Sequence, residues 1–378
     1  MTATHTHQRR PARRVIALGL FLLVAVPTIR PATAEEINRY IVDTGPLRIR
    51  DQFLLGMGFL AFDPVSADVQ PKGGWQLDLI TTITNTFAHS DVIDVELEAR
   101  DRRDSLTLAQ LRAIDAADSG DGVFQLDGEL YRTAIAARRG LGKGIQIELV
   151  LPILNFQGGI VDSTIEGFHD TFGFGQAGRI GVPRDDFLAY ARSSRGELFL
   201  DRAPGIQLGD VVVGSKFDLL RGSSERRFKL ALETLLKLPT GDESELASSG
   251  STDLGAQVLM TRYFDKACLH TSFGLLYLGE WEELGTPSQV LPSLMVAYER
   301  ALGPKSSGLA QLTVSESPFR DLELDELAET SIQVTLGFKK VLWERKVLFV
   351  GFTENIQNLN NTADVGFHVG LTQTFDPR

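Results

Sequence analysis

Apolar and polar residues alternate with a period of two along the last stretch of the chain, residues 362–375. One face collects the large apolar side chains, and the other collects polar or very small ones: Val365, Phe367, Val369, Leu371 and Phe375 against Asp364, Gly366, His368, Gly370, Thr372 and Thr374. Successive side chains of a β-strand point to opposite sides, so the pattern predicts a strand with one apolar face. A length of about eleven residues suits a tilted strand that crosses a bilayer.

The same alternation recurs upstream and predicts about twelve strands in all. In the first of them, Leu77 and Leu79 face outward while Asp78 and Thr82 face inward. The predicted strands cover residues 75–87, 123–136, 145–151, 207–220, 228–238, 254–263, 269–278, 290–300, 309–315, 332–339, 347–354 and 362–375.

In the second predicted strand, the alternation of apolar and polar residues is interrupted once. Its large apolar residues, Phe124, Leu126 and Leu130, are expected to face outward, which turns Asp127 and Glu129 inward with Gln125. Arg132 then falls on the apolar face. Either its long side chain reaches the lipid headgroups near the inner rim, or a bulge reverses the phase.

The connections between the predicted strands alternate between short and long. The short ones are 138–144, 221–227, 264–268, 301–308 and 341–345, and the long ones include 89–122, 152–206, 239–253 and 316–331. Outer-membrane barrels have short periplasmic turns and long outer loops. The chain is therefore predicted to be an all-β protein, a transmembrane antiparallel up-and-down β-barrel with both ends on the periplasmic side.

Residues 1–34 are predicted to be a signal peptide. Four arginines precede an apolar run at residues 15–26, which is too short to span a membrane, and Ala32-Thr33-Ala34 forms a cleavage site. Removing the five arginines of this segment, which has no acid, takes the net charge from −11 to about −16. Such a negative charge argues against nucleic acid as a partner.

Residues 35–74 precede the first clear strand and have poor, glycine-rich alternation. We expect this N-terminal segment to sit in the lumen or the periplasmic mouth, although residues 42–62 could form an extra strand. Residues 75–378 then form the barrel.

The second long loop holds a helical pattern between Gly158-Gly159 and Gly173. Its apolar stripe is expected to fold into the lumen as a constriction. The polar side of this helix and the loop after it supply Asp162, Glu166, His169, Asp170 and Arg179. These residue types can bind a cation, but their spacing matches no defined metal site, and salt bridges in a wet lumen are the plainer interpretation.

Other candidate interior residues are Asp127 and Glu129, expected to pair with lysines such as Lys216, Lys229 or Lys237, and two inward histidines, His270 and His368. A serine–histidine–acid hydrolase built around His270 and Ser272 is the enzymatic alternative. No motif calls for a cofactor or a metal. Cys268 is the single cysteine and is expected to be a small structural residue.

Aromatic residues are expected to form girdles at both membrane interfaces. The inner girdle would contain Trp75, Tyr298, Trp343 and Phe375, and the outer one Phe87, Phe124 and Tyr277.

Several segments resemble one uncharacterised family of bacterial outer-membrane barrels, known as a domain of unknown function. They are Gly45-Pro46-Leu47, Arg50-Asp51-Gln52-Phe53, Asp127-Gly128-Glu129, Phe168-His169-Asp170, Phe172-Gly173, Ser317-Pro318-Phe319 and residues 362–368. Phe375 resembles the terminal aromatic signature of such barrels, and Leu238-Pro239-Thr240-Gly241 resembles loops of hydrophobic-compound transport barrels. The resemblance implies location and architecture, without an activity.

Three functions stay open at this point. The first is a passive channel or binding barrel for a small solute in the cell outer membrane, the second a lipid-modifying hydrolase, and the third a structural or assembly barrel. The expected partners are outer-membrane lipid, the barrel-assembly machinery and an unknown small solute.

Overall fold

The computed structural model describes residues 44–118, 122–173, 176, 178–220, 227–343, 345–356 and 360–376, all within one compact unit, residues 37–378. The predicted signal peptide lies outside the described residues. No helix in the described part of the chain is long and apolar enough to cross a membrane.

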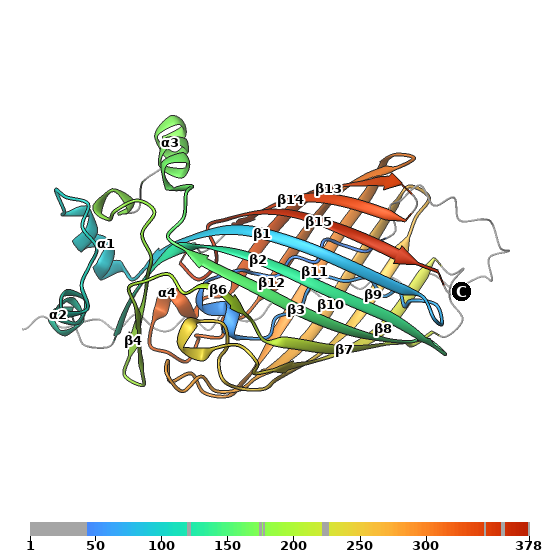
Figure 1. The fold of residues 1–378 in the computed structure, drawn as a ribbon, viewed down its shortest axis with the longest axis horizontal. Helices are drawn as coiled ribbons and strands as arrows, with labels where there is room; N and C mark the ends of the chain where they lie inside the picture. The colour runs from blue at the N-terminus through green and yellow to red at the C-terminus, as the bar shows by residue number, and fades with distance from the viewer. Residues whose placement is uncertain are drawn as a thin grey trace, which may run out of the picture. The chain divides into compact units, whose positions relative to one another are not determined.

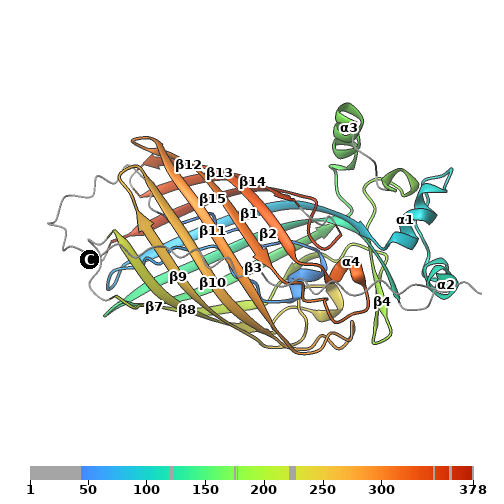
Figure 2. The same cartoon turned by 180° about the vertical axis from the view of Figure 1, so that it is seen from behind.

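Twelve of the described strands close into one antiparallel ring (Figures 1 and 2). Neighbours in the chain pair around the ring, and β1 pairs with both β2 and β15, which closes it. The predicted barrel is therefore confirmed. Its strands are β1 (Trp75–His89), β2 (Gly122–Gly142), β3 (Ile145–Gln157), β7 (Val211–Asp218), β8 (Phe228–Leu238), β9 (Asp253–Tyr263), β10 (Ala267–Leu278), β11 (Gln289–Gly303), β12 (Ser306–Ser315), β13 (Ser331–Trp343), β14 (Lys346–Asn355) and β15 (Val365–Phe375).

The two ends of the barrel differ in the way predicted from connection length. At one end, here the turn end, short connections such as residues 143–144 and 304–305 join the strands. The opposite end, the loop end, carries the remaining elements (Figure 1). They are α1 (Asp91–Glu98), α2 (Leu108–Asp118), α3 (Asp162–Phe172), η2 (Arg179–Gly181), β4 (Leu188–Ser193), β5 (Glu197–Leu200), β6 (Gly205–Leu208), η3 (Glu243–Glu245) and α4 (Asp325–Ala328).

The outer wall of the barrel is apolar, as the alternation predicts. Leu77 and Leu79 are 41% and 48% exposed, whereas Asp78 between them is 3% exposed. The aromatic prediction is correct for Trp75, Tyr298, Trp343, Phe375 and Tyr277, which are all exposed. It is wrong for Phe87 and Phe124, which are buried beneath loop-end elements.

The predicted phase of β2 is also wrong. Its pairing with β1 shows no register shift from His89↔Gln125 to Trp75↔Arg139, so no bulge reverses the faces. Arg132 and Arg138 point inward, and so do Leu130, Leu126 and Phe124, which belong to an apolar cluster inside the loop end. The inner face is apolar there because a second segment packs against it.

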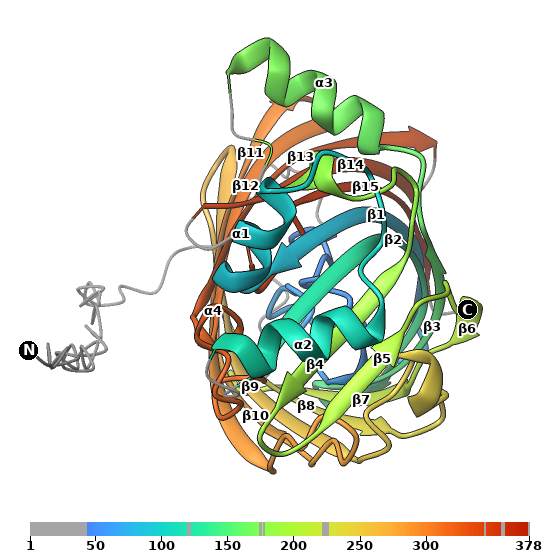
Figure 3. The ribbon, with the colours of Figure 1, turned by 90° about the vertical axis from the view of Figure 1, so that its left-hand side faces the viewer.

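That second segment is residues 44–74, which lie inside the ring of strands (Figure 3). We call it the inner segment. It contacts inward side chains from end to end: Leu47 exchanges two hydrogen bonds with Gln311, the Leu60 amide donates to Asp253, and the Ala67 amide donates to Thr261. It turns back near η1 (Leu55–Gly58) at the loop end and returns to the turn end, where Gly73 and Gly140 are hydrogen-bonded.

Inward glycines make room for this segment. A Cβ built at Gly337 or Gly351 would lie 2.4 or 2.9 Å from Leu47 Cδ1, and one built at Gly274 would lie 2.5 Å from the Phe62 ring. The strands therefore accept Leu47 and Phe62 only because these wall positions lack side chains.

Replacing Gly274 with alanine is expected to lower the free energy of unfolding by about 1–3 kcal/mol, because the added methyl group overpacks the Phe62 ring. Denaturant unfolding in lipid vesicles measures the change. Gly167→Ala is the control, since a Cβ at Gly167 meets nothing within 4 Å. Equal stability of both variants would contradict the packing of Phe62 against this wall.

Candidate functional site

Charged side chains hold the inner segment to the wall in the middle of the barrel. Arg48 forms ion pairs with Asp63 (3.2 Å), with Asp78 of β1 (3.5 Å) and with Glu148 of β3. Arg138 of β2 also pairs with Asp78. All five side chains are largely buried, so each charge is stabilised mainly by its ion-pair partners and not by water.

Lys237 of β8 also holds the inner segment to the wall, nearer the loop end. Its ammonium group lies 2.8 Å from Asp210 and 3.1 Å from Asp253, and it also donates to the carbonyl oxygen of Gly58. Lys216 pairs with Glu233, Lys229 with Asp68 and Lys339 with Glu299. The predicted pairing of Lys216, Lys229 or Lys237 with Asp127 and Glu129 is therefore wrong.

An apolar cluster closes the interior at the loop end. Phe53 and Phe59 of the inner segment pack edge to face against Phe319, and Phe59 also packs against Trp281, with ring centroids 5.6–6.2 Å apart. Leu126 and Leu130 of β2 join the same cluster. The wet lumen expected along the whole barrel is thus replaced here by a dry core.

Small cavities lie between the inner segment and the wall, and two of them have volumes of about 30 Å³ each. They adjoin one another, because both are lined by Arg50, Leu60, Arg132, Val150 and Val212. The first is otherwise mostly apolar, while Arg48, Asp63 and Glu148 line the second. Each is large enough for one or two water molecules.

Sequence reasoning missed Arg48, Arg50 and Arg132 as interior residues. One signal was present, since Arg132 contradicted the phase assigned to its strand. The two inner-segment arginines had no periodic pattern that could place them.

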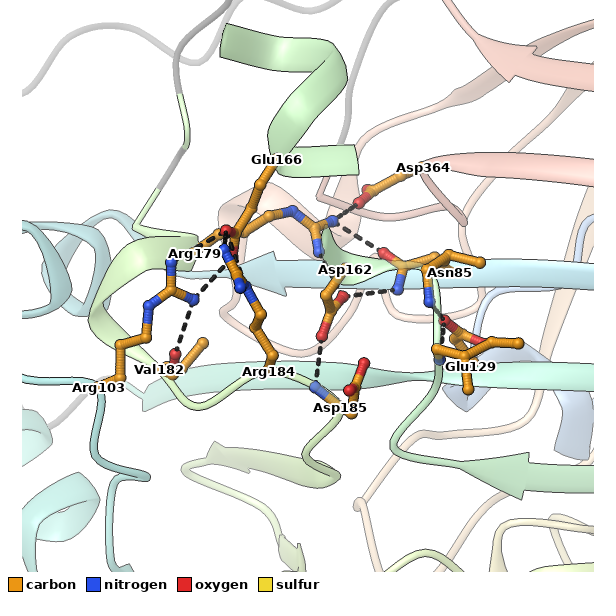
Figure 4. Close-up of polar contacts among 12 residues, drawn as sticks. Asn85, Arg103, Glu129, Asp162, Glu166, Arg179, Val182, Arg184, Asp185 and Asp364 are labelled. Carbon is orange, nitrogen blue, oxygen red and sulfur yellow. Dashed lines mark hydrogen bonds and ion pairs between the residues drawn. The ribbon is translucent and has the colours of Figure 1, made fainter. Parts of the chain in front are cut away.

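Four residues predicted to line or constrict the lumen gather instead on the outer face of the barrel wall, where β1 and β2 extend at the loop end: Glu129, Asp162, Glu166 and Arg179 (Figure 4). Side chains alternate along β2 without a register shift. Arg132 points inward, so Asp127 and Glu129, at odd-numbered positions, point outward. Glu129 accepts hydrogen bonds from the amides of Ile160 and Val161. The prediction of a lumenal position for these two acids is wrong.

Arg179 is the centre of this outer cluster. It donates to Asn85 of β1, pairs with Asp162 at 3.3 Å and with Asp364, and stacks over the Phe87 ring at 4.6 Å. Asp162 also accepts from the Asp185 amide. The cluster ties three loop segments to the end of the wall, and Arg179 is the cation shared by Asp162 and Asp364.

The predicted helix forms as α3, but it does not fold into the lumen. It lies to one side of the ring in Figures 1 and 3. Asp170 is exposed, and the His169 side chain lies outside the described part of the structure. Glu166 is held by Arg103 (2.7 Å) and Arg184 (2.5 Å). The helix stays outside because the inner segment and the loop-end cluster already fill the interior.

Burial would raise the pKa of the Glu166 carboxyl, but its bonds to Arg103 and Arg184 outweigh burial and lower the pKa to about 2. Because the folded pKa lies below the usual 4.5, these ion pairs contribute stability above about pH 5 and lose it as the pH falls toward 2.

Glu166→Gln is therefore expected to lower the free energy of local opening of residues 158–186 by about 1 kcal/mol at pH 7. The effect is small because both arginines are partly exposed. Amide hydrogen exchange should then be about fivefold faster in this segment, and the difference should vanish near pH 2. Glu245→Gln, which removes a single exposed pair with Arg202, is the control. A difference that persists at pH 2 would contradict the ion-pair explanation.

Both inward histidines have interior partners. His270 contacts Thr261 Oγ1 (2.9 Å) and Cys268 Sγ (3.1 Å), and His368 contacts Thr82 and Thr353. Among the described residues, neither ring is hydrogen-bonded to a serine or a carboxylate. This geometry does not assemble the serine–histidine–acid set of the hydrolase alternative.

Cys268, His270 and Glu299 form the one described group with metal-ligand spacing, their ligand atoms lying within 4.8 Å of one another. Zinc accepts all three ligand types. However, Glu299 already binds Lys339 at 2.8 Å and accepts from Ser307, so a metal ion would have to displace a buried ammonium group.

The closed ring, apolar belt and long loops define an outer-membrane channel-like β-barrel. The chain belongs to the family described as "Protein of unknown function (DUF3187)", whose model matches residues 119–375, and the predicted family resemblance is confirmed. The search among curated proteins found no match.

Solved structures show the same fold. The chain is similar to the COG4313 outer membrane channel from Pseudomonas putida F1, with a TM-score of 0.50 and 11% identity over 83% of this chain and 100% of that one. More distant likenesses are the NanC porin (TM-score 0.43, 8% identity, 79% and 98% covered) and the P. putida toluene transporter TodX (TM-score 0.38, 7% identity, 88% and 99% covered). These three structures are described as those of a channel, a porin and a transporter.

Proposed function

We propose that the mature protein resides in the cell outer membrane, exported by a signal peptide cleaved near Ala34 and inserted by the barrel-assembly machinery. The turn end would face the periplasm and the loop end the outside. Supporting observations are the exposed apolar wall, the aromatic residues at its turn-end rim and the terminal Phe375, which is 45% exposed. Outer-membrane lipid is then the partner of the wall.

We further propose that the barrel captures a small solute in its interior and passes it passively. The observation that carries this proposal is the pair of adjoining cavities between the inner segment and the wall. They lie in the middle of the barrel and combine charged and apolar lining residues. Passage requires the inner segment to shift, because the cavities are much smaller than an open pore.

Conductance and liposome-swelling measurements on the purified full chain test this proposal. A narrow channel should give small, solute-dependent fluxes. The structural-barrel alternative is favoured by how completely residues 44–74 occupy the interior, and it predicts no flux of any solute. Absence of both conductance and swelling, with the barrel folded, would reject the channel.

A further inference from the structure

Arg132 of β2 is a buried cation without a protein partner. Its side chain points into the barrel and is 5% exposed, yet it makes no hydrogen bond or ion pair with any described residue. Asp63 attracts it, but the Asp63 carboxylate is bound by Arg48 at 3.2 Å. A buried charge without a counter-charge is costly, so this arrangement calls for a specific reason.

Arg50 of the inner segment lines the same two cavities as Arg132. Its guanidinium donates to the carbonyl oxygens of Asp51 (3.2 Å) and Gly56 (2.8 Å) and forms no ion pair with a described residue. The two arginines repel each other. Asp63, Glu148 and Glu233 also line the second cavity, but Arg48 or Lys216 already binds each of them, so neither Arg50 nor Arg132 has a carboxylate partner among the described residues.

Elsewhere in the described interior, buried cations have carboxylate partners. Carboxylates pair with each of the other inward cations described above: Arg48, Arg138, Lys216, Lys229, Lys237 and Lys339. In the first cavity the one acid is Asp210, and Lys237 binds it at 2.8 Å. Among the inward cations of the described residues, Arg50 and Arg132 are the two without a carboxylate partner, and both line the cavities.

We propose that Arg50 and Arg132 form a binding site for a carboxylate group. A guanidinium presents two parallel N–H donors that match the two oxygens of a carboxylate. The cavity volume of about 30 Å³ corresponds to one or two water molecules, which is the size of such a head group. This inference rests on the proposed function and names its solute class as small carboxylic acids.

The lining of the first cavity indicates where the rest of the bound acid would lie. Besides the arginines, it is lined by Met57, Phe59, Pro152 and Leu154. A short apolar tail on the carboxylate would contact these side chains, whereas a highly polar or multiply charged solute would leave its other groups without partners.

Isothermal titration of formate, acetate and hexanoate into the folded full chain in detergent tests the site. Formate and acetate should bind, and acetamide, the neutral counterpart of acetate, should not. Arg132→Gln and Arg50→Gln should each weaken acetate binding at least about tenfold, and Arg132→Lys should restore part of it. Arg112→Gln, which removes an exposed pair with Glu197, should bind as the wild type does.

Two outcomes would overturn the site: no carboxylate binds the folded wild type, or acetate binds Arg132→Gln unchanged. Tighter binding of hexanoate than of acetate would identify the carboxylate end of an apolar acid, and equal or weaker binding would identify a free small carboxylate. Both support the site.

Thermal unfolding in anion-poor buffer separates a ligand-binding Arg132 from a structural one. Arg132→Gln should unfold at the same or a higher temperature than the wild type, because no ion pair is lost. A marked fall would show that Arg132 holds the fold, and would overturn the proposal. Solute flux without acetate binding would reject the carboxylate site alone, whereas binding without flux would reject the channel alone.

Discussion

Replacing Arg48 with methionine should lower the free energy of unfolding by about 3–5 kcal/mol. Arg48 is the shared partner of Asp63, Asp78 and Glu148, and its loss leaves buried carboxylates without their main counter-charge. Asp78 keeps Arg138, so the cost falls mainly on Asp63 and Glu148. Unfolding by guanidinium in lipid vesicles, followed by tryptophan fluorescence, measures the change.

Arg50→Met is the matched control for this experiment. Arg50 lies two residues from Arg48 on the inner segment, but it forms no ion pair with a described residue. Its replacement should cost less, about 1–2 kcal/mol, because it removes two hydrogen bonds to backbone carbonyl oxygens. Equal losses in both variants would mean that the stability comes from the length of the side chains and not from the Arg48 ion pairs.

Deleting residues 44–70 is expected to raise single-channel conductance by about an order of magnitude or more, because a ring of twelve strands is wider than the eight-stranded barrels that side chains fill by themselves. Arg48, Phe53 and Phe59, which now occupy the centre and the loop end, leave with the deleted residues. Planar-bilayer recording measures the effect.

Phe59→Ala keeps the inner segment at full length and removes the ring that packs against Trp281 and Phe319. It should lower the free energy of unfolding by about 3–5 kcal/mol and give brief openings. If neither variant conducts more than the full chain, the inner segment is not what closes the barrel.

The sequence was sufficient to predict the ring, its strand count and its two unlike ends. The dyad pattern of strands such as β9 and β15 is strong, because lipid demands apolar side chains at every second position. Trp75, Tyr298 and Trp343 were placed correctly for the same reason.

Where the strands run past the apolar belt, this demand ends and the prediction fails. Phe124, Leu126 and Leu130 look like a lipid-facing set, yet the aromatic residues of the inner segment are their partners. Alternation shows that two faces of a strand differ, but not which face meets lipid. Placing Arg132 or Glu129 required the register with β1.

The position of residues 44–74 before β1 has a consequence for biogenesis. The ring is sealed where the first strand of the barrel meets the last, β1 against β15. The segment must therefore enter the ring before β1 pairs with β15, or else enter it through one of its ends afterwards. In the first case, the wall folds around a peptide that was synthesised before any of the strands.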